Sequence, residues 1–220
     1  MTPDAFLAEL DAQNLRALAR IREKGAVPLP PLPQAGEALT VVRLLGLALK
    51  NELEATECAA AWIVTTPEVH AKLAFARQVG DEARHYRLIE KRLRELGAVP
   101  PDPSKLPRSP LLDYLLGLQH TVERVAAGQF TREALAVVRN EEFVRFCEAH
   151  GDHATAALYT DVIQPDETHH HQLGRTLLRE LATTDELQHL ARDASARTLS
   201  LADELQEIAR LKGIASAPGC

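Results

Sequence analysis

Two stretches of the chain each carry a glutamate followed three residues later by a histidine, and the stretches read as near copies. The first contains Glu82 and His85, the second contains Glu167 and His170, and both run on to a Leu-Arg-Glu-Leu sequence. Residues i and i+3 of a helix project from one face, so each pair can bind a metal ion through a carboxylate oxygen and an imidazole nitrogen. The two copies therefore predict a site that holds two ions.

Apolar residues recur at helical spacing along most of the chain, and no window shows a convincing strand pattern. The elements that position these pairs are therefore helices. We predict an all-α fold with a break near Gly128, an extended proline-rich connector over 28–33 and a loop over 100–110 that crosses the end of a helix bundle. The predicted helices span residues 2–25, 44–65, 67–97, 111–150, 153–182 and 184–213.

Further carboxylates can be placed by counting residues from the turns. The short turn at 65–66 makes its two helices antiparallel neighbours, and a rise of about 1.5 Å per residue puts Glu52 level with Glu82. Glu52 also interrupts an otherwise apolar stripe. The turn at 151–152 puts the partner of Glu167 near position 137, which Glu133 and Glu141 bracket. Glu52 is thus predicted as a ligand, and the choice between Glu133 and Glu141 stays open on these grounds.

Composition excludes several classes of protein. The 220 residues are 45% hydrophobic and 25% charged, as in a globular domain. No apolar run is long enough for a membrane span and no secretion signal is recognisable, while three scattered cysteines favour a reducing compartment. A net charge of −6 and 4% aromatic residues disfavour a nucleic-acid partner. We expect a cytoplasmic protein without a membrane partner.

The ligand pattern resembles the ferritin-like di-iron carboxylate superfamily over residues 38–182. In that superfamily one carboxylate from each of two helices joins a Glu-x-x-His pair from each of two others. The interval from Glu52 to Glu82 is shorter than that from Glu133 to Glu167, which is similar to bacterial di-iron monooxygenases and ribonucleotide reductase small subunits. This similarity favours Glu133 over Glu141. The implied metal ligands are Glu52, Glu82, His85, Glu133, Glu167 and His170.

The resemblance also implies a fold and an activity. The fold is a ferritin-like four-helix bundle over 38–182, with an N-terminal helix and connector over 1–37 and a C-terminal helix and tail over 183–220. Two iron ions are expected as cofactor, with manganese or a mixed manganese–iron pair as alternatives. The implied activity is oxidation or hydroxylation of a small organic substrate by dioxygen or peroxide, with an external electron donor; a homodimer stays open, and no catalytic residue is assigned.

Two other functions stay open at this point. One is iron oxidation, iron storage or peroxide removal, and the other is a metal-free ferritin-like scaffold for interactions. A third Glu-x-x-His, formed by Glu186 and His189, lacks the Leu-Arg-Glu-Leu continuation and is interpreted as part of a helix N-terminus.

We also make predictions for three residues that stand next to the two Glu-x-x-His pairs. Asp81 and Asp166 precede the two ligand glutamates and are predicted to hydrogen-bond the imidazoles across the bundle. Pro165 cannot donate a backbone hydrogen bond, so it is expected to kink the ligand helix or to restart it.

Overall fold

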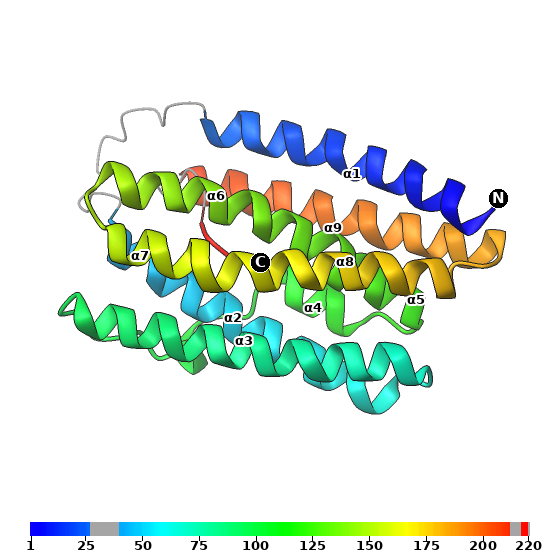
Figure 1. The fold of residues 1–220 in the computed structure, drawn as a ribbon, viewed down its shortest axis with the longest axis horizontal. Coiled ribbons are helices and arrows are strands. Elements are labelled where there is room, and N and C mark those ends of the chain that lie inside the picture. The colour runs from blue at the N-terminus through cyan, green and yellow to red at the C-terminus, as the bar shows by residue number, and fades with distance from the viewer. Residues whose placement is uncertain (27–39, 212–216, 220) are drawn as a thin grey trace.

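The computed structural model describes residues 1–26, 40–211 and 217–219, and within these ranges it contains helices and no strand (Figure 1). The all-α prediction is therefore confirmed. The predicted connector over 28–33, the boundary at 37–38 and the helix end at 212–213 lie outside the described residues. The elements are α1 (Pro3–Ala26), α2 (Val41–Thr65), α3 (Val69–Glu95), the 3₁₀ turn η1 (Pro103–Lys105), α4 (Pro110–Leu116), α5 (Thr121–Arg124), the π-helical η2 (Val125–Arg132), α6 (Glu133–Ala149), α7 (His153–Leu158), the π-helical η3 (Tyr159–Ile163), α8 (Gln164–Leu181) and α9 (Asp185–Leu211).

The predicted helix over 111–150 breaks in a different place from the one expected. The break lies between α4 and α5, where Gly117 follows the end of α4 and the carboxylate of Glu123 accepts a 2.9 Å hydrogen bond from the backbone N–H of His120. From α5 through η2 to α6 the chain stays helical across Gly128. A side chain at Gly128 would meet the Trp62 ring at 2.8 Å, so this glycine serves close packing.

Pro165 does not interrupt its helix. The segments α7, η3 and α8 follow one another without a gap, and Pro165 is the second residue of α8, just after the wide π-helical turn. α8 thus begins at Gln164, one residue before the predicted restart, but the helix stays continuous there, because the π-helical turn η3 absorbs the backbone irregularity.

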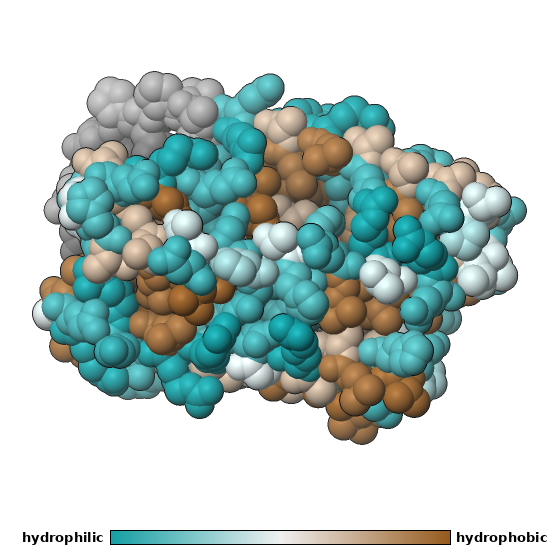
Figure 2. Space-filling model, in the orientation of Figure 1, coloured by the Kyte–Doolittle hydropathy of each residue, from teal (hydrophilic) through white to brown (hydrophobic). Residues whose placement is uncertain are grey.

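The long elements form two antiparallel pairs with further helices against them. α2 packs along α3, and α6 packs along α7 and α8, while α1 and α9 lie side by side over the second pair (Figure 1). None of the described helices is long and apolar enough to cross a membrane. The face seen in Figure 2 is mostly hydrophilic, with separated apolar groups.

Two apolar clusters lie at opposite ends of the central helices. The first includes Trp62, Phe75 and Phe130, and the second includes Leu45 and Tyr159. Along α2 and α3, and along the continuous segments η2–α6 and η3–α8, the predicted ligands stand between residues of one cluster and residues of the other. The fold therefore places a layer of carboxylates and imidazoles in the middle of an apolar core.

Candidate metal centre

All six predicted ligands lie inside the protein. Glu52 is 2% exposed, and the other five are fully buried. They come from four elements: Glu52 from α2, one Glu-x-x-His pair each from α3 and α8, and Glu133 from the first residue of α6. Charged side chains are almost never fully buried unless they are paired or bind an ion, so this layer calls for a chemical explanation.

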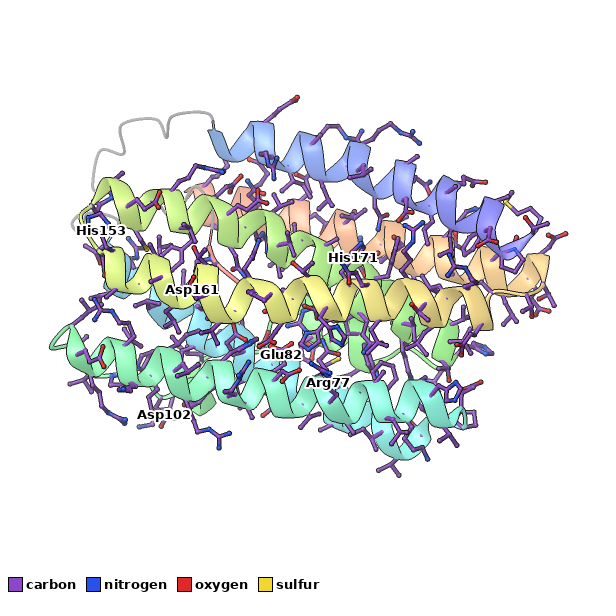
Figure 3. The ribbon with its side chains drawn as sticks, in the orientation of Figure 1. Arg77, Glu82, Asp102, His153, Asp161 and His171 are labelled. Atoms are coloured by element: carbon purple, nitrogen blue, oxygen red, sulfur yellow. The ribbon has the colours of Figure 1, made fainter. Side chains whose placement is uncertain are left out.

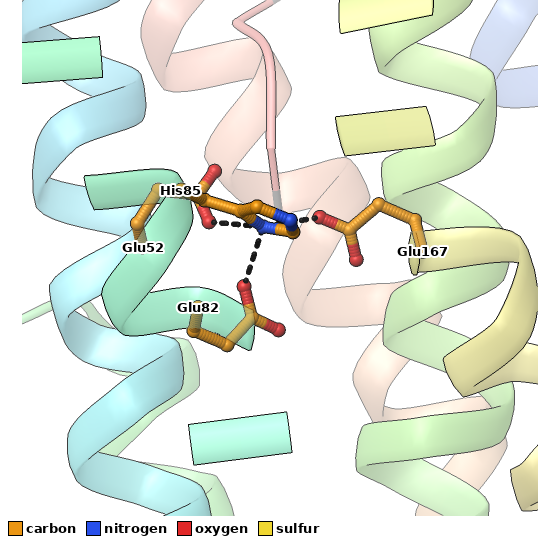
Figure 4. Close-up of side chains that lie close together, drawn as sticks. All are labelled: Glu52, Glu82, His85 and Glu167. Carbon is orange, nitrogen blue, oxygen red and sulfur yellow. Dashed lines mark hydrogen bonds and ion pairs between the residues drawn. The ribbon is translucent and has the colours of Figure 1, made fainter. Parts of the chain in front are cut away.

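The donor atoms form two overlapping groups. One contains Glu52, Glu82, His85 and Glu167 (Figure 4), and the other contains Glu82, Glu133, Glu167 and His170; within each group the donor atoms lie within 4.8 Å of one another. Glu82 and Glu167 belong to both groups. The geometry is therefore that of two neighbouring ion positions, each with one histidine and one carboxylate of its own, and with two shared carboxylates.

Both imidazoles direct Nδ1 at the carboxylates. The Nδ1 of His85 lies 3.3 Å from Glu82, 3.4 Å from Glu52 and 3.7 Å from Glu167. The Nδ1 of His170 lies 3.6 Å from Glu82, 3.7 Å from Glu167 and 3.9 Å from Glu133. Oxygen and nitrogen ligands bind a transition metal at about 2.0–2.2 Å, which puts neighbouring ligand atoms about 3–4 Å apart. The six side chains thus have a spacing at which they could hold metal ions.

Two aspartates hold the other ring nitrogens, and they do so crosswise. The Nε2 of His85 on α3 lies 2.9 Å from Asp166 on α8, and the Nε2 of His170 on α8 lies 3.1 Å from Asp81 on α3. This confirms the prediction for both aspartates. A hydrogen bond at Nε2 fixes the orientation of the ring and leaves Nδ1 to face the carboxylates.

Each of these aspartates also contacts an arginine on α3. Arg84 pairs with Asp166, and the Nε of Arg77 lies 3.3 Å from Asp81. Figure 3 shows Arg77 on α3 beside Glu82. Because both arginines are exposed and both aspartates are half-buried, a chain of charges runs from solvent to the buried imidazoles.

Gln78 belongs to the site, although the sequence analysis did not select it. Its Nε2 donates a 2.5 Å hydrogen bond to Oε1 of Glu133 and a 3.4 Å hydrogen bond to Oε1 of Glu82, and the side chain is 3% exposed. A signal was present, because Gln78 stands one helical turn before Glu82 in the buried stripe of α3. A polar residue in register with two predicted ligands is a candidate for the same site.

The two glutamates left open on α6 have different surroundings. Glu133 is fully buried and joins the second donor group. Glu141 is half-exposed and forms a 2.7 Å ion pair with Arg22 of α1. The structure therefore brings Glu133, and not Glu141, to the other ligands.

Four buried carboxylates so close together are unfavourable when all of them are ionised and no cation balances their charge. Burial, with repulsion from Glu82 in addition, raises the pKa of Glu52 and that of Glu167 to about 8. Burial, together with the charge of Glu167, raises the pKa of Glu133 well above its usual value. Burial acts in the same direction on Glu82, but the hydrogen bond and charge of His85 outweigh it and lower its pKa to about 2. Two divalent cations would neutralise four ionised carboxylates.

Several donor atoms also lack any hydrogen-bond partner. They are Oε1 of Glu52, both carboxylate oxygens of Glu167 and Nδ1 of His170. A buried lone pair without a donor is unfavourable, and a cation satisfies several lone pairs at once. The donor set, its burial and these unpaired atoms all fit a metal centre.

The third Glu-x-x-His motif lies elsewhere. Glu186 and His189 stand in the first turns of α9, where both are exposed, and Nε2 of His189 lies 3.2 Å from Asp193. Neither residue joins either donor group.

Comparisons with family models, with curated proteins and with solved structures find no match for this chain. The resemblance to ferritin-like proteins therefore rests on the ligand pattern in the sequence.

Proposed function

We propose that the chain is a ferritin-like di-iron carboxylate protein and acts as an oxidoreductase. In this proposal α2, α3, α6 and the α7–α8 segment are the four-helix bundle, and α1 and α9 are additions to it. One observation carries the proposal: two buried donor groups, each with its own histidine, share the carboxylates of Glu82 and Glu167. Shared carboxylates suit a pair of ions, because Glu82 and Glu167 would each offer an oxygen to both positions.

The chemistry of the donor atoms supports iron. Carboxylate oxygens and imidazole nitrogens favour iron or manganese, and neither donor group includes the thiolates that would favour structural zinc or copper(I). Both free cysteines of the described ranges, Cys58 and Cys147, are buried, and burial raises the pKa of each thiol to about 12. They therefore do not supply thiolates at neutral pH.

The residues around the ions would prepare the centre for redox chemistry. Two bound iron ions would supply the electrons that reduce dioxygen or peroxide, so that a small organic substrate is oxidised or hydroxylated. Asp81 and Asp166 orient the imidazoles, and Gln78 holds the carboxylates of Glu82 and Glu133 on one side. The apolar clusters at either end exclude water from the layer. An external donor completes the electron balance.

The first test is the metal content of the protein expressed with added iron, measured by mass spectrometry. We expect about two iron ions per chain, the loss of both in Glu82→Ala and the loss of at least one in His170→Ala, because Glu82 belongs to both donor groups and His170 to one. His189→Ala is the matched control, since it removes a histidine from an exposed Glu-x-x-His motif. A well-folded wild type without bound transition metal would refute the proposal and leave the scaffold interpretation.

A second test separates oxidation of a substrate from iron storage. An oxidoreductase should consume dioxygen when an external reductant is supplied, and should do so as a monomer or small oligomer. A storage protein should instead form a large multi-subunit cage and deposit many iron atoms per chain. Molecular mass in solution and the iron-to-protein ratio distinguish the two.

A further inference from the structure

The described segment Ala217–Gly219 runs back into the molecule between α2 and α6, where it approaches the donor groups (Figures 1 and 4). Pro218 and Gly219 are buried. Ala217 packs against the apolar cluster that contains Phe143 and Tyr159. The segment thus occupies a place inside the fold although it carries no apolar side chain larger than proline.

Two asparagine side chains hold its backbone. The Nδ2 of Asn51 on α2 donates a 3.0 Å hydrogen bond to the carbonyl of Pro218, and the N–H of Gly219 donates a 2.9 Å hydrogen bond to Oδ1 of Asn140 on α6. Asn51 is adjacent to the ligand Glu52, and Asn140 is fully buried. Both helices that supply a single carboxylate to the centre therefore also hold this segment.

Gly219 lies directly against a ligand. Its φ of +79° lies in the left-handed region, and a side chain there would lie 3.3 Å from Oε1 of Glu52 and 3.4 Å from Cβ of Asn51. Glycine is the residue that combines this φ with so close an approach. The oxygen that it covers, Oε1 of Glu52, is one of the donor atoms without a hydrogen-bond partner.

Two further unpaired polar atoms belong to Asn140, which holds the segment, and to Tyr159 of the cluster against which Ala217 packs. The Nδ2 of Asn140 and the hydroxyl of Tyr159 are buried and have no hydrogen-bond partner. Tyr159 packs edge-on against Phe143, with 4.8 Å between the ring centroids. Phe143 lies one helical turn after Asn140 on α6. The acceptor on Glu52 and the donor on Asn140 thus lie beside the segment, and a small polar molecule could use them if the segment moved away.

We propose that Ala217–Gly219 is a plug over the Glu52 side of the centre, and that it withdraws to admit small polar molecules. The inference rests on the proposed metal centre. A plug held by two side-chain hydrogen bonds can leave without unfolding any helix, because its own backbone belongs to none. The centre would then be closed at rest and open only when the segment is displaced.

The test uses Gly219→Val, in which the strained backbone and the added side chain displace the plug. Gly97→Val is the matched control, because Gly97 has a φ of +75° and nothing within 4 Å of an added side chain. In iron-loaded protein, a chelator should remove the metal about tenfold faster from Gly219→Val than from wild type. A tenfold change in rate corresponds to the free energy of about one or two hydrogen bonds, which is what the displaced plug loses. Equal rates in all three proteins would overturn the plug and leave the metal centre intact.

A second readout needs no metal. Hydroxyl-radical footprinting of the metal-free protein should label Tyr159 more in Gly219→Val than in wild type or Gly97→Val, because displacing the plug exposes that ring to solvent. If wild type binds no metal, the proposed function fails, and footprinting alone decides the plug. Unchanged labelling of Tyr159 in a folded Gly219→Val protein would refute it.

Discussion

The same motif occurs three times in this chain, buried in α3 and α8 and exposed in α9. In α3 and α8 the glutamate and histidine have no exposed surface. In α9, the side chain of His189 is 72% exposed and its neighbour Asp193 is 66% exposed. The three motifs have the same residue types at the same spacing. Type and spacing therefore cannot distinguish a buried Glu-x-x-His pair that could bind a metal from one on the surface.

The difference lies in the phase of the motif relative to the apolar stripe. In α3 the buried residues Phe75, Gln78, Glu82, His85 and Ile89 follow one another at intervals of three and four. In α9 the buried face runs through Gln188, Ala191, Ser195 and Thr198, and Glu186 and His189 lie off it. A Glu-x-x-His motif is a candidate metal site when it replaces apolar residues in the stripe that faces the core.

The largest expected effect tests whether buried motifs and shared carboxylates bind the metal. Glu167→Ala should abolish binding of both ions, because Glu167 belongs to both donor groups, while Glu52→Ala should remove about one ion. Glu186→Ala, the corresponding change in α9, should leave the metal content unchanged. Metal analysis of the purified variants measures this. Equal losses in Glu167→Ala and Glu186→Ala would contradict the comparison.

The next effect concerns the aspartates beside the histidines. Asp81→Asn and Asp166→Asn should each weaken metal binding about 10–100-fold, because each weakens the hydrogen bond that orients a ligand imidazole. Asp193→Asn, beside the exposed His189, should have no such effect. Titration with a competing chelator gives the affinities, and no change in either buried pair would show that the rings are held by packing alone.

A smaller effect is expected at the helix N-caps that precede the second and third motifs, Asp152 and Thr184. Asp152 caps α7 through a 3.0 Å bond from the N–H of Thr155 and pairs with Arg92 at 2.7 Å, whereas exposed Thr184 accepts from the N–H of Leu187 at 3.2 Å. Asp152→Ala should reduce the free energy of unfolding by about 1–2 kcal/mol, and Thr184→Ala by about 0.5–1 kcal/mol. Chemical denaturation measures both.

The effect of Asp152 should also depend on pH. Burial alone would raise the pKa of this carboxyl, but the hydrogen bonds from Thr155 and Arg92 outweigh burial and lower it. A carboxyl whose pKa is lower in the folded protein stabilises it above the unfolded pKa, and this contribution is lost as the pH falls through the folded value. The difference between wild type and Asp152→Ala should therefore shrink below about pH 4, and that for Thr184→Ala should not.

The smallest expected effect is that of His189→Ala. An exposed histidine paired with an exposed carboxylate contributes little, so the free energy of unfolding should change by no more than about 0.5 kcal/mol. Thermal or chemical unfolding measures it. A large loss of stability would show that α9 depends on this motif in a way that its exposure does not indicate.

The sequence by itself determined the helices and the orientation of the two buried Glu-x-x-His pairs. Both follow from local rules: periodicity decides which segments are helical, and the i, i+3 spacing decides that Glu82 faces the same way as His85. The crosswise role of Asp81 and Asp166 was also predictable, because it follows from two antiparallel copies of one motif.

Tertiary structure decided what depends on contacts between distant segments. It brought Glu133 rather than Glu141 to the other donors, placed the amide of Gln78 against Glu133, and set Gly128 under Trp62, where a break was expected. It also laid Gly219 beside Glu52. Spacing along a helix gives the direction of a side chain, whereas the partner it meets depends on the packing of helices that are far apart in the chain.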